Sequence, residues 1–553
     1  MARTKARVYT CCALSLLLIV AIIVCIAVAV HRRCPNDTFS KGAVAADSKK
    51  CSEIGRDILQ QGGSAVDGAI AALLCTSVIN PQSAGIGGGS IFTVMDSSGK
   101  VKIINSRETA PSIIKPDLLN SCPKAFQMVT GNKWIGVPGE IRGYETAHKL
   151  YGKLLWATLF QPTIKLAREG IKIPEVQGSS IPYISNTDET RALWKLFSDK
   201  KGNLLKIGGT VKFEKLADTL EIIANNGADS FYSGKIAEDL VHDVQEAGGT
   251  LMLQDLANYN VTVTDAWAVP FGEYQMYIPP PPAGGAVLSL VLNILKGYQM
   301  NSAPQSIDEK TLFYHRYVEA LKFANGQKKH IRDPHFVSDK ITKKIVEDNF
   351  ASHIRTLISS ERTRDLQYYN ITPHQDSLGT THVSVLAEDG SAVSVTSTIN
   401  HIFGSRIYSS RTGVILNNEL YDFCGRTDNI SPGERPPSSM APSVLKSQSK
   451  TIVIGASGGS FIMTGIASTL INHLWFGKSL KEAINVPIVF VDSKNSLKFE
   501  PKFEEDVIVA LKARGHNHET TTKFYNVVNA VERQGGCICA VSDARKLGEA
   551  AGY

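Results

Sequence analysis

Two alternating segments directly after Gly379 constrain this chain more than any other feature. In each segment, valines alternate with polar residues, which is the period of a β-strand. Residues 388–390, Glu-Asp-Gly, lie between the two segments and supply a turn. The pattern therefore predicts a β-hairpin, whose apolar positions are Val383, Val385, Val393 and Val395.

Thr380 stands between Gly379 and this hairpin. Cleavage of the chain before Thr380 would give that residue both a hydroxyl and a free α-amine. The hydroxyl could then attack a substrate while the amine takes its proton. The ordinary alternative is a threonine that opens a strand because of its β-propensity. Thr380 is therefore a candidate nucleophile of a chain that cuts itself.

Length and composition indicate an ordinary folded protein. At 553 residues the chain can bury a large core and could form two or more domains. Hydrophobic residues make up 43% and charged residues 20%. The net charge of +7 is mild for this length, and no block of Lys and Arg is interleaved with aromatic residues. We therefore expect no nucleic-acid partner.

The N-terminal segment predicts a membrane anchor. Residues 13–30 carry no charge, and Cys11 and Cys12 extend the run to about the length that spans a bilayer. Basic residues are in slight excess before the run, which places the N-terminus inside and the bulk of the chain outside. We expect a cytoplasmic tail over 1–10, a signal anchor over 11–30 and a single-pass type II protein of the plasma membrane. The alternative is a cleaved signal peptide, although the run is long and lacks a clear cleavage site.

The cysteines and glycosylation motifs agree with an extracellular location. Ten cysteines are too few for a disulfide scaffold. Two predicted helices, 48–61 and 65–78, flank a Gly-Gly turn and bring Cys51 and Cys75 side by side, so the pair forms either a disulfide or two buried thiols. No Cys/His cluster has zinc spacing. Asn-x-Ser/Thr motifs, which are glycosylation acceptors, begin at Asn36, Asn260, Asn370 and Asn429.

Beyond the anchor, the chain reads as a short stalk over 31–45 followed by alternating helix and strand patterns. The middle, about 140–350, is predicted to be mostly helical, with an apolar helix over 286–295. The polar segment 351–379 is an exposed cleavage segment or a plain surface loop. The glycine run at 85–89 precedes a strand instead of following one, which disfavours a nucleotide loop.

Several ordered motifs together resemble the gamma-glutamyltransferase (glutathione hydrolase) family. They cover the chain from about residue 42 to residue 553, and some wording is similar to the vertebrate gamma-glutamyl leukotrienase branch. The resemblance implies an α+β fold, the N-terminal-nucleophile hydrolase four-layer αββα sandwich. It also implies self-cleavage into a large chain, 46–379, and a small chain, 380–553, which stay together as a heterodimer. It implies no metal or organic cofactor. The motifs are Val44–Asp47, Gly85–Gly89, Asn105–Glu108, Val137–Gly139, Gly379–Val385, Arg435–Met440 and Gly548–Tyr553.

The resemblance also assigns a binding site for a γ-glutamyl group. Arg107 would hold its α-carboxylate, because a planar and always charged fork suits a carboxylate. Ser438 and Ser439 would add hydroxyl donors to that carboxylate. Glu419 and Asp422 would bind the α-ammonium group. Opposite charges at the two ends of one amino acid would select γ-glutamyl over most other acyl groups.

The remaining assignments concern the reacting atoms. Thr398 would hydrogen-bond the nucleophile Thr380, and Asn400 would lie beside the acidic pair. Gly458 and Gly459 would point backbone N–H groups at the developing oxyanion.

These assignments lead to an expected reaction and two alternatives. Thr380 would attack the γ-amide of glutathione or of glutathione S-conjugates such as leukotriene C4, and water or an amino-acid or dipeptide acceptor would resolve the ester. One alternative is an amidase of other specificity on the same fold, which would not need these charges. The other is an inactive surface paralogue that acts as a binding protein, although Thr380 and Arg107 are both present.

Overall fold

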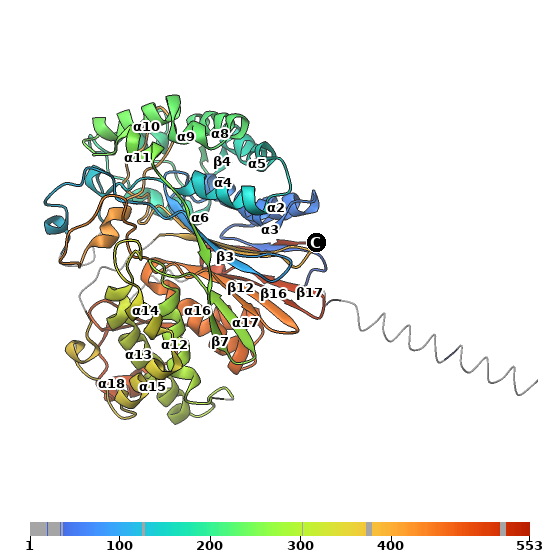
Figure 1. The fold of residues 1–553 in the computed structure, drawn as a ribbon, viewed down its shortest axis with the longest axis vertical. Coiled ribbons are helices and arrows are strands. Elements are labelled where there is room, and N and C mark those ends of the chain that lie inside the picture. Colours follow the sequence, from blue (N-terminus) through green and yellow to red (C-terminus); the bar gives the residue numbers. More distant parts are fainter. Residues whose placement is uncertain are drawn as a thin grey trace, which may run out of the picture.

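The computed structural model describes residues 37–123, 128–300, 302–371, 379–519 and 527–553, together with Ile19 and Cys34. Two large β-sheets lie face to face in the middle of the molecule, and a layer of helices covers the outer face of each (Figure 1). This is an α+β fold with the four layers αββα that the family resemblance predicts.

The first sheet has seven strands and contains the predicted hairpin. β9 and β10 are antiparallel neighbours, with Thr381 opposite Ser397. In spatial order the strands are β18 (Ala551–Gly552), β1 (Ala43–Ala45), β9 (Thr381–Leu386), β10 (Ala392–Thr398), β2 (Gly89–Met95), β3 (Val101–Asn105) and β6 (Thr262–Asp265).

The second sheet has six strands. In spatial order they are β17 (Cys537–Val541), β16 (Val527–Gln534), β12 (Lys450–Ser457), β11 (Ser443–Lys446), β8 (Tyr274–Ile278) and β7 (Trp267–Phe271). A small core of apolar side chains, among them Leu386, Val453 and Val531, lies between the two sheets.

The larger cores lie between each sheet and its helices. The seven-stranded sheet carries the helices in the upper half of Figure 1, chiefly α2 (Lys49–Gln60), α3 (Ala65–Ile79), α4 (Glu140–Tyr151), α5 (Trp156–Glu169), α8 (Glu214–Asn226) and α10 (Gly234–Glu246). The six-stranded sheet carries those in the lower half, chiefly α12 (Gly285–Lys296), α13 (Ile307–Gln327), α15 (Asp348–Leu357), α16 (Ile462–Leu470), α17 (Leu480–Asn485) and α18 (Glu505–Ala513).

The hairpin is buried on both faces. Its valines pack in the core under the upper helices, as alternation predicts. Its polar residues, however, face the second sheet instead of solvent. Ser384 Oγ donates to the carbonyl of Asn529 (3.0 Å), and Ser394 Oγ donates to that of Ile454 (2.9 Å). Hydrogen bonds between the sheets thus satisfy hydroxyls that an isolated hairpin would give to water.

The helices around the Gly-Gly turn are confirmed. Ser48 caps α2 and Ser64 caps α3, the latter with a reciprocal bond from Asp67. Cys51 and Cys75 form a disulfide, so the alternative of two buried thiols is wrong. The predicted helix over 286–295 is α12.

Other segments differ from expectation. The stalk predicted over 31–45 is too long, because residues 43–45 form β1, which is paired on both sides by β18 and β9. The mostly helical middle also contributes β6, β7 and β8 to the two sheets. Part of the polar segment, residues 351–357, completes α15. β1 and β6 are short strands that pair with strands far away in the sequence, and a local pattern does not contain those partners.

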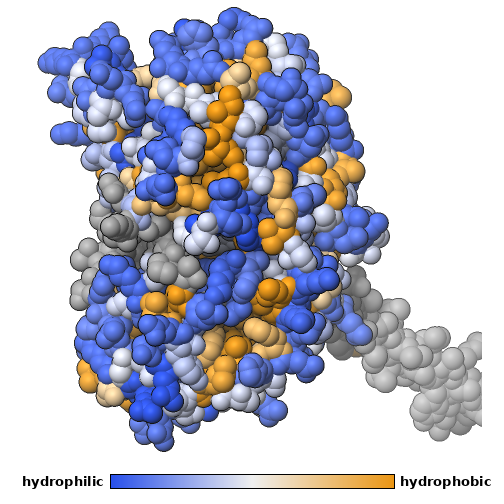
Figure 2. All heavy atoms as spheres, turned by 60° about the vertical axis from the view of Figure 1, so that its left-hand side comes forward, coloured by the Kyte–Doolittle hydropathy of each residue, from blue (hydrophilic) through white to orange (hydrophobic). Residues whose placement is uncertain are grey.

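The predicted anchor over 11–30 lies outside the described residues, apart from Ile19. Within the part of the chain that the structure describes, no helix combines the length and the apolar character needed to cross a membrane. Figure 2 shows one face of the molecule, on which hydrophilic residues predominate and apolar residues form narrow groups.

Candidate active site

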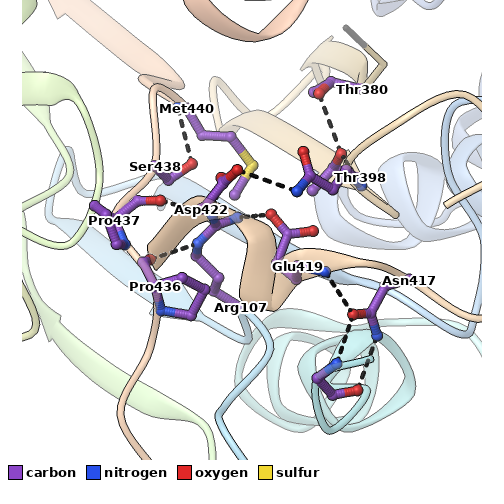
Figure 3. Close-up of polar contacts among 12 residues, drawn as sticks. Arg107, Thr380, Thr398, Asn417, Glu419, Asp422, Pro436, Pro437, Ser438 and Met440 are labelled. Carbon is purple, nitrogen blue, oxygen red and sulfur yellow. Dashed lines mark hydrogen bonds and ion pairs between the residues drawn. The ribbon is translucent and has the colours of Figure 1, made fainter. Parts of the chain in front are cut away.

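The hairpin brings the two predicted catalytic threonines together. Thr380 immediately precedes β9, and Thr398 is the last residue of the antiparallel β10. Their hydroxyl oxygens lie 3.1 Å apart, within hydrogen-bonding distance (Figure 3). Both side chains are buried, so neither hydroxyl exchanges this partner freely for bulk water.

The backbone at Gly379–Thr380 is strained and is held by hydrogen bonds. Thr380 has φ of +81°, a region that β-branched residues rarely adopt and that costs roughly 1–3 kcal/mol. The carbonyl oxygen of Gly379 accepts a hydrogen bond from the N–H of Gly458 (3.1 Å). A Cβ at position 379 would lie 1.9 Å from the carbonyl oxygen of Asn400, so only glycine fits there. The Gly379–Thr380 peptide is thus held with a donor on its carbonyl oxygen.

Three residues that support Thr380 carried no assigned role in the sequence. Lys546 Nζ donates to the carbonyl of Thr380 (2.7 Å) and also contacts Asp47 Oδ2 (2.7 Å) and Ser457 Oγ (2.9 Å). Asp47 in turn accepts a bond from the hydroxyl of Thr381 (2.7 Å). Asp47 belongs to a recognised motif, but nothing in the sequence marks Lys546, which is 166 residues from Thr380.

A buried charged cluster forms the second half of the site. Arg107, two residues after the end of β3, is 1% exposed, and its two terminal nitrogens contact Glu419 Oε1 (2.6 Å) and Asp422 Oδ2 (2.7 Å). The carbonyls of Pro436 and Pro437 accept further bonds from its guanidinium (2.8 and 2.7 Å; Figure 3). The acids lie on one short 3₁₀ helix, η6 (Glu419–Phe423), which places both on the same side of the arginine.

Burial dominates the protonation of this cluster. It raises the pKa of Glu419 to about 7, against the opposing charge of Arg107, and it also raises the pKa of Asp422. Although burial lowers the pKa of Arg107, the carboxylates of Glu419 and Asp422 outweigh that effect and raise it. Next to Arg107, Glu108 is fully buried, and burial together with the charge of Glu419 raises its pKa well above the usual range.

Asn400 connects the two halves. Its N–H donates to Thr398 Oγ1 (2.8 Å), and its side-chain amide donates to Asp422 Oδ1 (3.1 Å). A continuous chain of polar contacts therefore runs from Thr380 through Thr398 and Asn400 to Asp422 and Arg107. Asn400 has φ of +73°, a conformation that asparagine adopts more readily than most residues.

The two predicted serines line a cavity beside the acids. Ser438, Ser439 and Asp422 border a space of about 440 Å³, within the usual range for small-molecule sites. Ser438 Oγ accepts a bond from the N–H of Met440 (3.1 Å). Thr380 does not line this cavity, although Ser460, next to the Gly458–Gly459 pair, does. The remaining wall is mixed in character. It includes the basic Lys328, Lys329 and Arg332, the acidic Asp428 and Glu434, and the apolar Val287, Ile331, Phe423 and Met463.

Two groups of residues elsewhere in the described chain have ligand atoms close enough for a metal ion. One is the buried His315–Glu319–His516, and the other is the more exposed His242–Asp243–Glu246. A cationic side chain already adjoins each group, since Lys322 Nζ lies 3.0 Å from His516 Nδ1 and Arg411 pairs with Asp243. Neither group contacts the residues described above.

Comparison with known proteins identifies the family of this chain. A family model described as Gamma-glutamyltranspeptidase matches residues 51–553. The chain belongs to the gamma-glutamyltranspeptidase family. It is 45% identical to glutathione hydrolase 5 proenzyme of Rattus norvegicus over 96% of both chains. It is 44% identical to the Homo sapiens protein of the same name over 94% of both chains. The chain is therefore an enzyme of this family.

Solved structures support the same fold. Gamma-glutamyltranspeptidase of Helicobacter pylori is 26% identical, with a TM-score of 0.52, over 61% of this chain and 95% of that chain. A cephalosporin acylase from Bacillus halodurans superposes with a TM-score of 0.83 over 94% of this chain and 97% of that chain. At 24% identity, the acylase shows the fold alone.

Proposed function

We propose that this family member is a γ-glutamyl hydrolase and transferase that acts on glutathione and its S-conjugates after cutting itself before Thr380. The observation that carries the proposal is the polar chain that joins the Thr380 hydroxyl to the Arg107 cluster through Thr398 and Asn400. Through two intervening residues, it links a candidate nucleophile to groups that can bind both α-substituents of a γ-glutamyl donor.

Self-cleavage follows from the groups around the Gly379–Thr380 peptide. The Thr380 hydroxyl attacks the Gly379 carbonyl carbon, its proton passes to the Thr380 nitrogen, and the peptide C–N bond breaks to leave an ester. Water then hydrolyses the ester, which frees the Gly379 carboxylate and the Thr380 amine and hydroxyl. The N–H of Gly458 is positioned to stabilise the oxyanion that forms on Gly379. Cleavage also releases the strained φ of Thr380. The relatives named proenzymes agree with a precursor.

Donor binding exchanges one set of ion pairs for another. The donor's α-carboxylate would form an ion pair with the guanidinium of Arg107, and its α-ammonium would form ion pairs with Glu419 and Asp422. The exchange conserves charge, so the buried groups need not be left unpaired. The freed Thr380 hydroxyl then attacks the γ-carbonyl, its proton moves to the Thr380 amine, and the amine of the leaving peptide takes a proton as the C–N bond breaks. Water, an amino acid or a dipeptide resolves the γ-glutamyl ester.

The cavity wall supports S-conjugates with a long apolar substituent, such as leukotriene C4, whose apolar chain ends in a carboxylate. Val287, Ile331 and Met463 offer apolar contacts, and the charged part of the wall contains both basic residues, such as Lys329, and the acidic Asp428 and Glu434. Of the proline-rich segment 279–285, Gly284 lines the cavity and the four prolines do not. Most of the wall instead comes from residues 421–439, which contain η6 and the two serines, and the segment after α13 supplies much of the rest.

We also propose that residues 11–30 anchor the enzyme in the plasma membrane with the catalytic domain outside. Three disulfides in the described chain favour an oxidising compartment. The sequon residues Asn260, Asn370 and Asn429 are all exposed. An antibody against a C-terminal tag should stain intact cells. Staining only after permeabilisation would contradict this topology.

The decisive experiment measures turnover by purified protein of glutathione, leukotriene C4 and a small chromogenic γ-glutamyl anilide, each with and without glycylglycine. We expect conversion of leukotriene C4 to D4, turnover of bulky S-conjugates and poor turnover of the anilide. Transfer appears as γ-glutamyl-glycylglycine. Strong anilide turnover without leukotriene conversion would contradict the leukotriene preference. Absence of turnover of every γ-glutamyl donor would favour the inactive paralogue.

A further inference from the structure

Two of the three disulfides in the described chain cross the proposed cleavage point. Cys34 pairs with Cys537, and Cys122 pairs with Cys424. The third pair, Cys51–Cys75, lies within the large chain. We propose that the large and small chains remain one covalent molecule after self-cleavage, joined by these two disulfides. The inference rests on the proposed function, because it requires the cut before Thr380.

The Cys34–Cys537 bridge joins the beginning of the described chain to the last third of the small chain. Close to it, Phe39 and Ile538 exchange two backbone hydrogen bonds of 2.7 Å each. β1 then continues between β9 and β18, both of which belong to the small chain. The bridge therefore fastens the small chain to the segment that directly follows the proposed anchor.

The Cys122–Cys424 bridge lies at the substrate site. Cys424 directly follows η6 and is two residues from Asp422, whereas Cys122 is on the same proposed chain as Arg107. The ion pairs of Arg107 with Glu419 and Asp422 therefore also join the proposed large chain to the small chain, as the bridge does. A core of only six buried apolar residues supports this region, namely Ala110, Leu118, Trp134, Leu420, Tyr421 and Phe423.

The free thiol nearest to the first bridge offers a matched control. Cys539 is two residues from Cys537 on β17 and has no disulfide partner. Burial raises the pKa of its thiol, which keeps it protonated and disfavours exchange with the bridge. Cys539→Ser should therefore leave the junction, meaning the two disulfides that link the large and small chains, unchanged.

The test is denaturing electrophoresis of mature protein, alkylated with N-ethylmaleimide before denaturation, with and without dithiothreitol. Denaturation is needed because the shared sheets would hold the chains together in the native state. We expect one full-length band without reductant and two bands with it. Cys34→Ser and Cys424→Ser should each keep the single unreduced band, because the other bridge remains. The double variant should show two bands in both lanes, and Cys539→Ser should match the wild type.

The outcomes separate the junction from the cleavage. Two wild-type bands without reductant would overturn the proposal of a disulfide link between the chains, but they would agree with self-cleavage. One wild-type band with reductant would overturn self-cleavage, and the junction with it. A double variant that stays whole without reductant but separates with it would also overturn this assignment. Because that variant could misfold, wild-type protein is also digested without reduction. Peptides linking Cys34 to Cys537 and Cys122 to Cys424 are expected by mass spectrometry, and their absence would overturn the proposal.

Discussion

Replacement of Arg107 by lysine keeps the positive charge but removes the planar fork. In the structure the fork makes four contacts of 2.6–2.8 Å, to Glu419, Asp422 and two backbone carbonyls. A lysine ammonium could meet one oxygen of the donor's α-carboxylate in place of two. One lost charge-assisted hydrogen bond is worth about 1.5–3 kcal/mol. Since 1.36 kcal/mol is tenfold, kcat/KM for a γ-glutamyl donor should fall by about 10- to 150-fold.

The loss should appear mainly in KM, because the interaction is made with the bound donor as well as with the transition state. The assay measures kcat and KM with glutathione and follows chain cleavage on reducing gels. Arg435→Lys is the matched control, since Arg435 is also buried but donates to the carbonyl of Asn260. It should change kcat/KM far less. If Arg107→Lys abolished cleavage and activity together, the residue would have a folding role and the binding argument would be refuted.

Four further predictions follow from the site. Thr380→Ala should leave the chain uncut on reducing gels, and a protein that still splits before position 380 would exclude Thr380 as the attacking group. Thr398→Val removes a hydroxyl that contacts Thr380 and Asn400. Cleavage and turnover should both slow by about 5- to 150-fold, as expected for ~1–3 kcal/mol, and unchanged rates would contradict its role. Gly458→Ala should slow self-cleavage, measured by pulse-chase. The φ of +111° at this position disfavours a side chain, which would displace the N–H that donates to the Gly379 carbonyl. Cleavage at the wild-type rate would contradict this role of Gly458. Because burial raises the pKa of Glu419 to about 7, kcat/KM should fall as pH drops through about 7 and the carboxylate loses its charge. Between pH 4.5 and about 7 the folded state binds more protons than the unfolded state, so the contribution of Glu419 to stability should decline as pH rises through that window. A kcat/KM that does not change between pH 6 and 8, values chosen to bracket the pKa, would exclude Glu419 as the titrating group.

Local chemistry in the sequence was enough to predict several parts of the structure. Alternating valines and a turn specified the β9–β10 hairpin, and a Gly-Gly turn between two helical segments specified α2 and α3. Family motifs pointed to the residues that meet at the site. These features could be read because each depends on residues that are close in sequence, or on residue types with one dominant chemistry, as for Arg107.

The tertiary structure decided what lies across the sheets and across the proposed cut. Lys546 reaches Thr380 only because the two sheets stack, and the burial of Ser384 follows from the same packing. The Cys34–Cys537 pairing joins residues 503 positions apart, a distance over which no periodic pattern operates. Side-chain periodicity reports which face a residue occupies within its own element, whereas the partner of that face depends on how distant elements pack. The sequence therefore determined the reactive groups, and the fold determined which backbone donors, counter-ions and disulfides surround them.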